Sequence, residues 1–93
     1  MTTAIVLIKS RTDQVSALAE RIANVNGVSE VFSVAGQYDL VAVVRVADNE
    51  ALAAVVSDQI RKLAGIVDSQ TLIAFRAYSR REVEAGFSLG TED

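Results

Sequence analysis

Side chains that could carry out chemistry are scarce in this 93-residue chain, which contains no histidine and no cysteine. Their absence excludes a Ser-His-Asp triad, a cysteine nucleophile, a thiolate zinc site, an iron–sulfur cluster and a His-ligated haem. The most distinctive polar stretch is Gly36-Gln37-Tyr38-Asp39, which interrupts two apolar segments. Asp39 and Tyr38 alone do not form an acid–base pair of known geometry. The residue types therefore indicate binding rather than catalysis, with no metal and no cofactor, although glycine and aspartate also form ordinary hairpin turns.

The charge distribution argues against direct contact with nucleic acid. Nine Lys and Arg stand against 12 Asp and Glu, a net charge of −3, whereas nucleic-acid binders usually show a basic stripe. Only Arg76, Arg80 and Arg81 cluster, and we expect them to form a solvated edge beside Glu82 and Glu84. No apolar run reaches the roughly 18 residues of a membrane span, and no signal peptide is evident. We therefore expect a cytoplasmic protein with no membrane partner.

The first half of the chain predicts a strand, a helix and a second strand. Ala4 to Ile8 is a short apolar run rich in β-branched residues, which is typical of a buried strand. Thr12 or Asp13 is expected to cap the following helix, and Asn26-Gly27 is expected to end it. The stretch from Val28 to Ala35 returns to extended structure. The apolar stripe of the helix consists of Val15, Leu18, Ala19, Ile22 and Val25.

The second half repeats this pattern. Leu40 to Val46 is apolar at every position except Arg45, which predicts a strand in the centre of its sheet. A second helix is expected to begin within Ala47 to Glu50 and to end at Gly65. Val67 to Tyr78 is predicted as the last strand. The apolar stripe of the second helix consists of Leu52, Val55, Val56, Ile60 and Leu63.

The order β-α-β-β-α-β predicts an α+β, ferredoxin-like fold. Two right-handed crossovers give a four-stranded antiparallel sheet with both helices on one face, and the first and third strands are then central. These are also the two most apolar strands. The uncovered sheet face would expose apolar side chains, so we expect a homodimer formed through that face, as in a dimeric α/β barrel. Phe32 and Phe75 are expected in the core.

Two motifs give the chain a family resemblance. The first begins with Gly27-Val28, continues through a strand to Gly36-x-Tyr38-Asp39, and ends in an apolar strand closing with Arg45-Val46. The second is Leu63-Ala-Gly-Ile66, followed by Ser69-x-Thr71. Over residues 3 to 79 the chain resembles the effector-binding domain of the Lrp/AsnC, or feast/famine, transcription regulators, which is also called the RAM domain.

The resemblance implies a binding site for a small effector. In the family, effectors are mostly amino acids and bind between dimers, near the turn that joins the second and third strands. Asp39 would accept a hydrogen bond from the ammonium group, and Tyr38 would form an apolar wall with one polar tip. Backbone N–H groups around Gly36 and the hydroxyls of the last strand would bind the carboxylate. The implied site residues are Gly36, Gln37, Tyr38, Asp39, Ser69 and Thr71. Ser69 and Thr71 are also ordinary residues for a half-exposed strand.

Full-length regulators of this family carry an N-terminal helix-turn-helix domain, whereas this chain begins at its first strand. It is therefore expected to be a stand-alone version of the module, with residues 1–79 as the ligand-binding domain. Residues 80–93 are expected to form a C-terminal tail, in which Phe87 and Leu89 could dock.

The expected partners are an amino-acid-like effector, further copies of the chain in a dimer and then an octamer or decamer, and a full-length Lrp/AsnC regulator. Two other functions remain open from the residues. One is a small dimeric ferredoxin-like enzyme of the monooxygenase or isomerase type, which the apolar inward positions disfavour. The other is a purely structural oligomerisation module.

Overall fold

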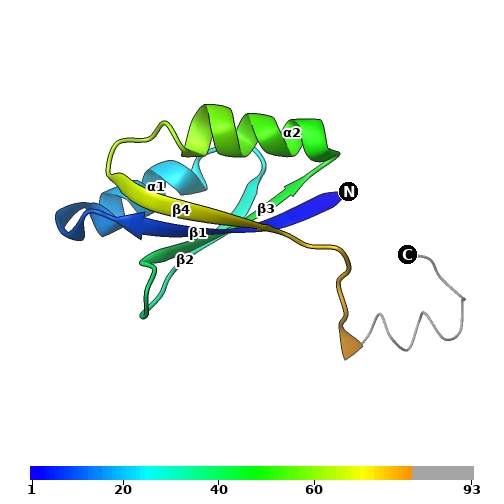
Figure 1. Cartoon of the computed structure of the whole chain (residues 1–93), viewed down its shortest axis with the longest axis horizontal. Coiled ribbons are helices and arrows are strands. Elements are labelled where there is room, and N and C mark those ends of the chain that lie inside the picture. Colours follow the sequence, from blue (N-terminus) through cyan, green and yellow to red (C-terminus); the bar gives the residue numbers. More distant parts are fainter. Residues whose placement is uncertain (81–93) are drawn as a thin grey trace, which may run out of the picture.

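The computed structural model describes residues 1–80 and contains one antiparallel sheet with a layer of helices on one side (Figure 1). The strands are β1 (Thr2–Ser10), β2 (Val28–Ser33), β3 (Leu40–Val46) and β4 (Ile66–Ile73). The helical segments are η1 (Thr12–Gln14), α1 (Val15–Ala23), α2 (Asn49–Ala53) and η2 (Ala54–Ile60). The segment η2 is π-helical and continues α2, so the two together are called the second helix below.

The strand order β2-β3-β1-β4 confirms the predicted ferredoxin-like topology, with β1 and β3 in the centre. Both are apolar on their two faces, and a central strand has two neighbours as well as two covered faces. Val6 of β1 pairs with Ala42 of β3 on one side and with Thr71 of β4 on the other. This register places alternate residues of all four strands on a common face.

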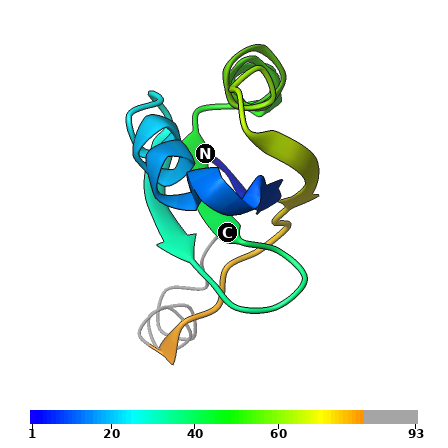
Figure 2. The same ribbon diagram turned by 90° about the vertical axis from the view of Figure 1, so that its left-hand side faces the viewer.

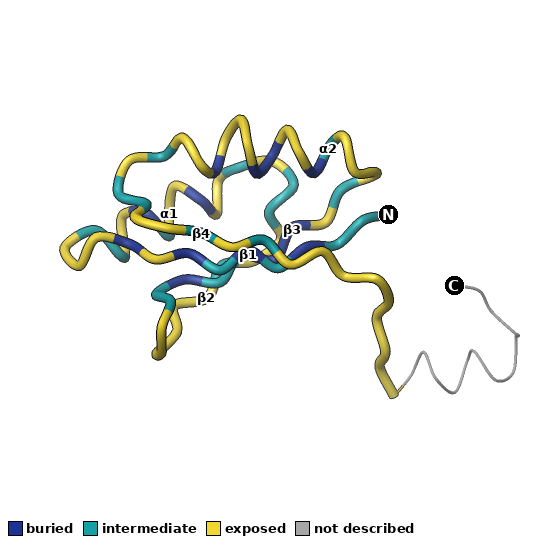
Figure 3. The backbone as a smooth tube through the Cα atoms, in the orientation of Figure 1, coloured by how far each residue is buried: buried dark blue, intermediate teal, exposed yellow. Residues whose placement is uncertain are grey.

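Both helices lie on one face of the sheet (Figures 1 and 2). α1 contacts β2 and β3, while α2 contacts β3 and β1. The buried residues, dark blue in Figure 3, lie between the helices and this face. Burial of such side chains is the main source of stability in a small domain. The core residues are Ala4, Val6, Ile8, Leu18, Ile22, Leu40, Ala42, Val44, Leu52, Val55, Val56 and Ile60.

The opposite face of the sheet has no helix over it among the residues described. Its centre is apolar and is formed by Ile5 and Leu7 of β1 together with Val41 and Val43 of β3, which pair across the two strands. Phe32 and Leu72 extend this apolar area onto the edge strands and are 48% and 45% exposed. We call this surface the open face.

Two glycines mark the same place in the two halves of the chain. Gly27 and Gly65 each lead into a strand after a helix, with φ of 100° and 101°, values that residues with a side chain rarely adopt. A Cβ on Gly27 would lie 2.9 Å from Val55 Cγ2 and 3.0 Å from Val46 Cγ1. Here the strand after α1 passes so close to the second helix that only glycine fits.

The start of the second helix was correctly predicted, and that of the first was not. Asp48 is the N-cap of α2, and its carboxylate accepts a hydrogen bond of 2.8 Å from the Ala51 N–H. Neither Thr12 nor Asp13 caps α1, because the chain enters the helix through the 3₁₀ turn η1. In that turn the Gln14 N–H donates to the Arg11 carbonyl at 3.0 Å, so a backbone bond rather than a side-chain bond leads into the helix.

Two strands end earlier than predicted, and two aromatic residues lie outside the core in which they were predicted. β2 ends at Ser33 rather than Ala35, and β4 ends at Ile73 rather than Tyr78. The pairing of β4 with β1 ends at Ile73 opposite Ala4, and one more bond of 2.9 Å follows from the Ala74 N–H to the Thr3 carbonyl. Phe75 lies beyond this pairing and is 99% exposed, and Phe32 is on the open face rather than in the core.

The predictions for Arg81, Glu82, Glu84, Phe87 and Leu89, and for nearly all of the expected tail, lie outside the described residues.

Candidate functional site

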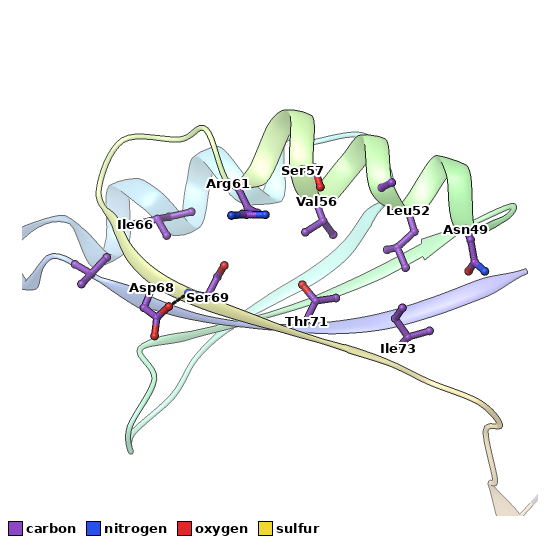
Figure 4. A pocket seen from close by; sticks show the side chains of 12 residues that line it. Asn49, Leu52, Val56, Ser57, Arg61, Ile66, Asp68, Ser69, Thr71 and Ile73 are labelled. Carbon is purple, nitrogen blue, oxygen red and sulfur yellow. Dashed lines mark hydrogen bonds between the residues drawn. The ribbon is translucent and has the colours of Figure 1, made fainter.

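A groove of about 670 Å³ lies between the second helix and the edge strand β4 (Figure 4). Its volume is within the range of about 300–1,000 Å³ that is usual for small-molecule sites. The residues lining it are Asn49, Leu52, Ala53, Val56, Ser57, Arg61, Ile66, Val67, Asp68, Ser69, Thr71 and Ile73.

The groove exists because the second helix packs over the centre of the sheet and not over its edge. Leu52 and Val56 reach down to the buried residues of the central strands. β4 presents Ser69 and Thr71 at the inward positions that pair with Ile8 and Val6 of β1. The open edge therefore carries hydrogen-bonding groups on the floor of the groove. In Figure 4 both hydroxyls point from β4 toward the helix.

The second group of predicted site residues lies in the loop between β2 and β3, residues 34–39. The Tyr38 hydroxyl bonds to Gln70 Oε1 at 3.0 Å, and the Asp39 carboxylate accepts the Ser10 N–H at 2.8 Å through Oδ2. The Asp39 N–H donates to the Ile8 carbonyl at 2.9 Å. These bonds fasten the loop to β1 and β4. Gly36 and Gln37 form its exposed tip, where Gly36 has φ of 134°.

The loop and the groove lie on opposite sides of the sheet within one chain. Ser69 and Thr71 are on the face that the helices cover, whereas Gln70, the residue between them, carries the hydrogen bond to Tyr38. Figure 1 accordingly shows the loop below the sheet and the second helix above it. The structure thus brings Gly36, Gln37, Tyr38 and Asp39 together, and brings Ser69 and Thr71 together, but it does not join the two groups.

Four polar residues of the groove were not predicted from the sequence: Asn49, Ser57, Arg61 and Asp68. Asn49 and Ser57 lie eight residues apart, and Asn49 is three residues before Leu52 in the apolar stripe, so helical spacing could have placed them at the stripe's margin. Arg61 follows the buried Ile60 and lies off the stripe in a regular α-helix. No signal in the sequence marks it.

Within residues 1–80, no three carboxylates gather as a metal ion would require. In the same part of the chain, no helix combines the length and the apolar character that a bilayer crossing needs.

Comparison with known proteins connects this fold to a family of regulators. The family model of the Lrp/AsnC ligand binding domain matches residues 3–84. An uncharacterized HTH-type transcriptional regulator from Pyrococcus horikoshii is 36% identical over 77 residues, which are 80% of this chain and 51% of that protein. The chain therefore spans about half the length of this curated relative.

Two solved structures resemble the chain in fold and sequence. The crystal structure of TTHA0845 from Thermus thermophilus has a TM-score of 0.81 and 52% identity, and covers 86% of this chain and all of that one. A feast or famine regulatory protein from M. tuberculosis, complexed with L-methionine, has a TM-score of 0.67 and 29% identity. That match covers 87% of this chain and 55% of the mycobacterial one.

Proposed function

Because the chain belongs to the Lrp/AsnC family through its ligand-binding domain, we propose that it binds an amino-acid-like effector without converting it chemically. The groove lined by the hydroxyls of Ser69 and Thr71 is the observation that carries this proposal. The methionine bound to the mycobacterial relative supports an amino acid as the ligand class. For a ligand of about ten heavy atoms, micromolar affinity needs about 0.8 kcal/mol per atom, which lies within the range of small ligands and suits a sensor of metabolite pools.

We propose that the complete site forms between two copies of the chain. One copy supplies the groove, with the Ser69 and Thr71 hydroxyls for the carboxylate of the ligand. A neighbouring copy supplies residues 34–39, where Asp39 accepts the ammonium group. Only Oδ2 of Asp39 is used by the Ser10 N–H, so Oδ1 remains for a ligand. The separation of the two groups on opposite sides of the sheet supports this arrangement, because within one chain Ser69 and Thr71 cannot contact the same ligand as Asp39.

The open face is the proposed dimer interface. Ile5, Leu7 and Val41 in its centre are only half-buried, Phe32 and Leu72 beside them are 48% and 45% exposed, and burial of such a patch is a general driving force for association. Dimers would then assemble into an octamer or decamer in which a loop of one dimer meets a groove of the next. The ligand would favour the assembly to which it binds more tightly.

The role in transcription follows from the relatives and is also a proposal. The curated relative is a helix-turn-helix regulator about twice as long as the region shared with this chain. We propose that the module acts in the cytoplasm, on a partner regulator of the same family, without contacting DNA through the residues described.

Calorimetry with each of the 20 L-amino acids, together with sedimentation velocity in their presence, tests the proposal. At least one amino acid should bind and change the distribution of oligomers. Indifference to all of them would contradict the proposed function and leave a purely structural oligomerisation module.

A mixing experiment tests whether the site is shared between copies. Thr71→Val removes a groove hydroxyl and Asp39→Asn removes the loop charge, so each variant alone should bind poorly. In an equimolar mixture that is unfolded and refolded together, roughly a quarter of the sites should combine an intact groove with an intact loop and regain affinity. No recovery in the mixture would contradict a shared site.

A further inference from the structure

The second helix changes its winding where it passes over the groove. It begins as the α-helix Asn49–Ala53 and continues as the π-helix Ala54–Ile60. At its end the Arg61 N–H donates to the Val56 carbonyl at 2.9 Å, five residues back. The i→i+5 hydrogen bond of a π-helical turn brings residues five apart onto roughly the same side of the helix, whereas in an α-helix they point about 140° apart. The π-helical turn therefore places Arg61 on the same side as Val56, over the groove.

The guanidinium of Arg61 has no protein partner within residues 1–80. Arg21 donates to the Ala64 carbonyl at 3.0 Å, and Arg11 pairs with Asp13 at 3.7 Å, but Arg61 makes no such side-chain bond there. In Figure 4 the guanidinium lies beneath the helix, and the Ser69 hydroxyl points toward it. An unpaired guanidinium beside hydroxyl groups is an arrangement that suits a carboxylate.

Asp68 also lines the groove, but its carboxylate does not lie between the Arg61 guanidinium and the Ser69 hydroxyl. The Asp68 side chain accepts the Ser69 N–H at 2.9 Å, and in Figure 4 it points away from the helix. The groove thus has a positive end at Arg61. Toward Asn49 the lining becomes apolar through Leu52 and Ile73.

We infer that Arg61 binds the carboxylate of the ligand, together with the Ser69 and Thr71 hydroxyls, and that it selects ligands with a free carboxylate. The side chain of the ligand then lies toward Leu52 and Ile73. This inference rests on the proposed function. It adds a specificity-determining residue that the hydroxyls cannot replace, because hydroxyl groups bind a neutral amide as well as a carboxylate.

Calorimetry with the tightest-binding L-amino acid and with its C-terminal amide tests the inference. The wild-type chain should bind the amide about 10- to 100-fold more weakly, as expected for the loss of a charged hydrogen bond. Arg61→Gln should weaken the amino acid by a similar factor and bring the acid-to-amide ratio close to one. Arg61→Lys should keep part of the preference, since lysine retains the charge but not the planar fork.

The matched control is Lys62→Gln, which removes the same charge from the next residue. Lys62 is exposed and does not line the groove, so this variant should bind like the wild type. Because Arg61 is also exposed, Arg61→Gln should keep the wild-type melting temperature. Wild-type affinity and an unchanged acid-to-amide ratio in Arg61→Gln would overturn the inference while leaving the proposed function in place. If no amino acid binds the wild-type chain, both fall together.

Discussion

The two edge strands of the sheet differ in how the helices cover them. β2 lies under α1, and its inward residues Val28 and Val31 pack against the core. The second helix packs over the central strands β3 and β1 rather than over β4, and the inward residues Ser69 and Thr71 of β4 line an open groove. The two halves of the chain repeat the same order of elements, so the topology does not cause this difference. The placement of the second helix over the central strands leaves this edge open, since the apolar Ile73 on the same face of β4 is also 54% exposed.

Truncation of one leucine in each helix should cost more free energy of unfolding beside the closed edge β2 than beside the groove. Leu18 of α1 is 0% exposed, and Leu18→Ala should lower the free energy of unfolding by about 2–5 kcal/mol through the lost contacts and the cavity. Leu52 borders the groove, so Leu52→Ala should cost less, near the lower end of that range of about 2–5 kcal/mol. Urea denaturation measures both values. Equal costs would mean that the groove is closed in solution.

Alanine at two glycines compares a crowded position with an open one. Gly27→Ala should destabilise the chain by about 2 kcal/mol or more, because a positive φ is combined with contacts to Val55 and Val46. Gly36→Ala also has a positive φ, but nothing lies within 4 Å of the added Cβ, so about 1 kcal/mol is expected. Thermal unfolding of the two variants measures the difference. A larger loss of stability in Gly36→Ala than in Gly27→Ala would contradict the prediction.

A single substitution should make the floor of the groove apolar, like the inward face of β2. Thr71→Val replaces a groove hydroxyl with a methyl group, and the free energy of unfolding should change by less than about 1 kcal/mol. Affinity for the effector should fall about tenfold, through the loss of one hydrogen bond. Calorimetry and urea denaturation of the same sample check both values. Thr71→Ser, which keeps the hydroxyl, should bind nearly as well as wild type; a matching loss in Thr71→Ser would assign the effect to shape.

The smallest effect is expected at the loop. Tyr38→Phe removes the 3.0 Å bond to Gln70, but this bond is exposed, so the free energy of unfolding should fall by less than about 0.5 kcal/mol. Amide hydrogen exchange in residues 34–39 should become faster. A loss above about 1 kcal/mol would show that the loop is as firmly packed as the closed edge.

Much of the fold could be predicted because its signals are local. Val43 and its neighbours in β3 are apolar on both faces, and so is the middle of β1. This pattern predicts the two central strands, and the strand order confirms it. Asp48 was recognised as part of a helix start for a similar reason, since a capping carboxylate acts within three residues. The predictions were wrong where the end of an element depends on a partner far along the chain. The sequence predicts Phe75 in the core, yet the pairing of β4 with β1 ends at Ile73 and Ala4, so Phe75 lies beyond it and is 99% exposed.

The sequence by itself determined which of the predicted site residues lie together. The two-residue period of a strand places Ser69 and Thr71 on one face, and residues 34–39 share one short loop. Only the tertiary structure decided that these two groups lie on opposite sides of the sheet and that Arg61 reaches the groove. The physical reason is that the packing of the helices decides which face of an edge strand is covered and which is not. Likewise, the π-helical turn changes the angular position of Arg61 without any change in residue type.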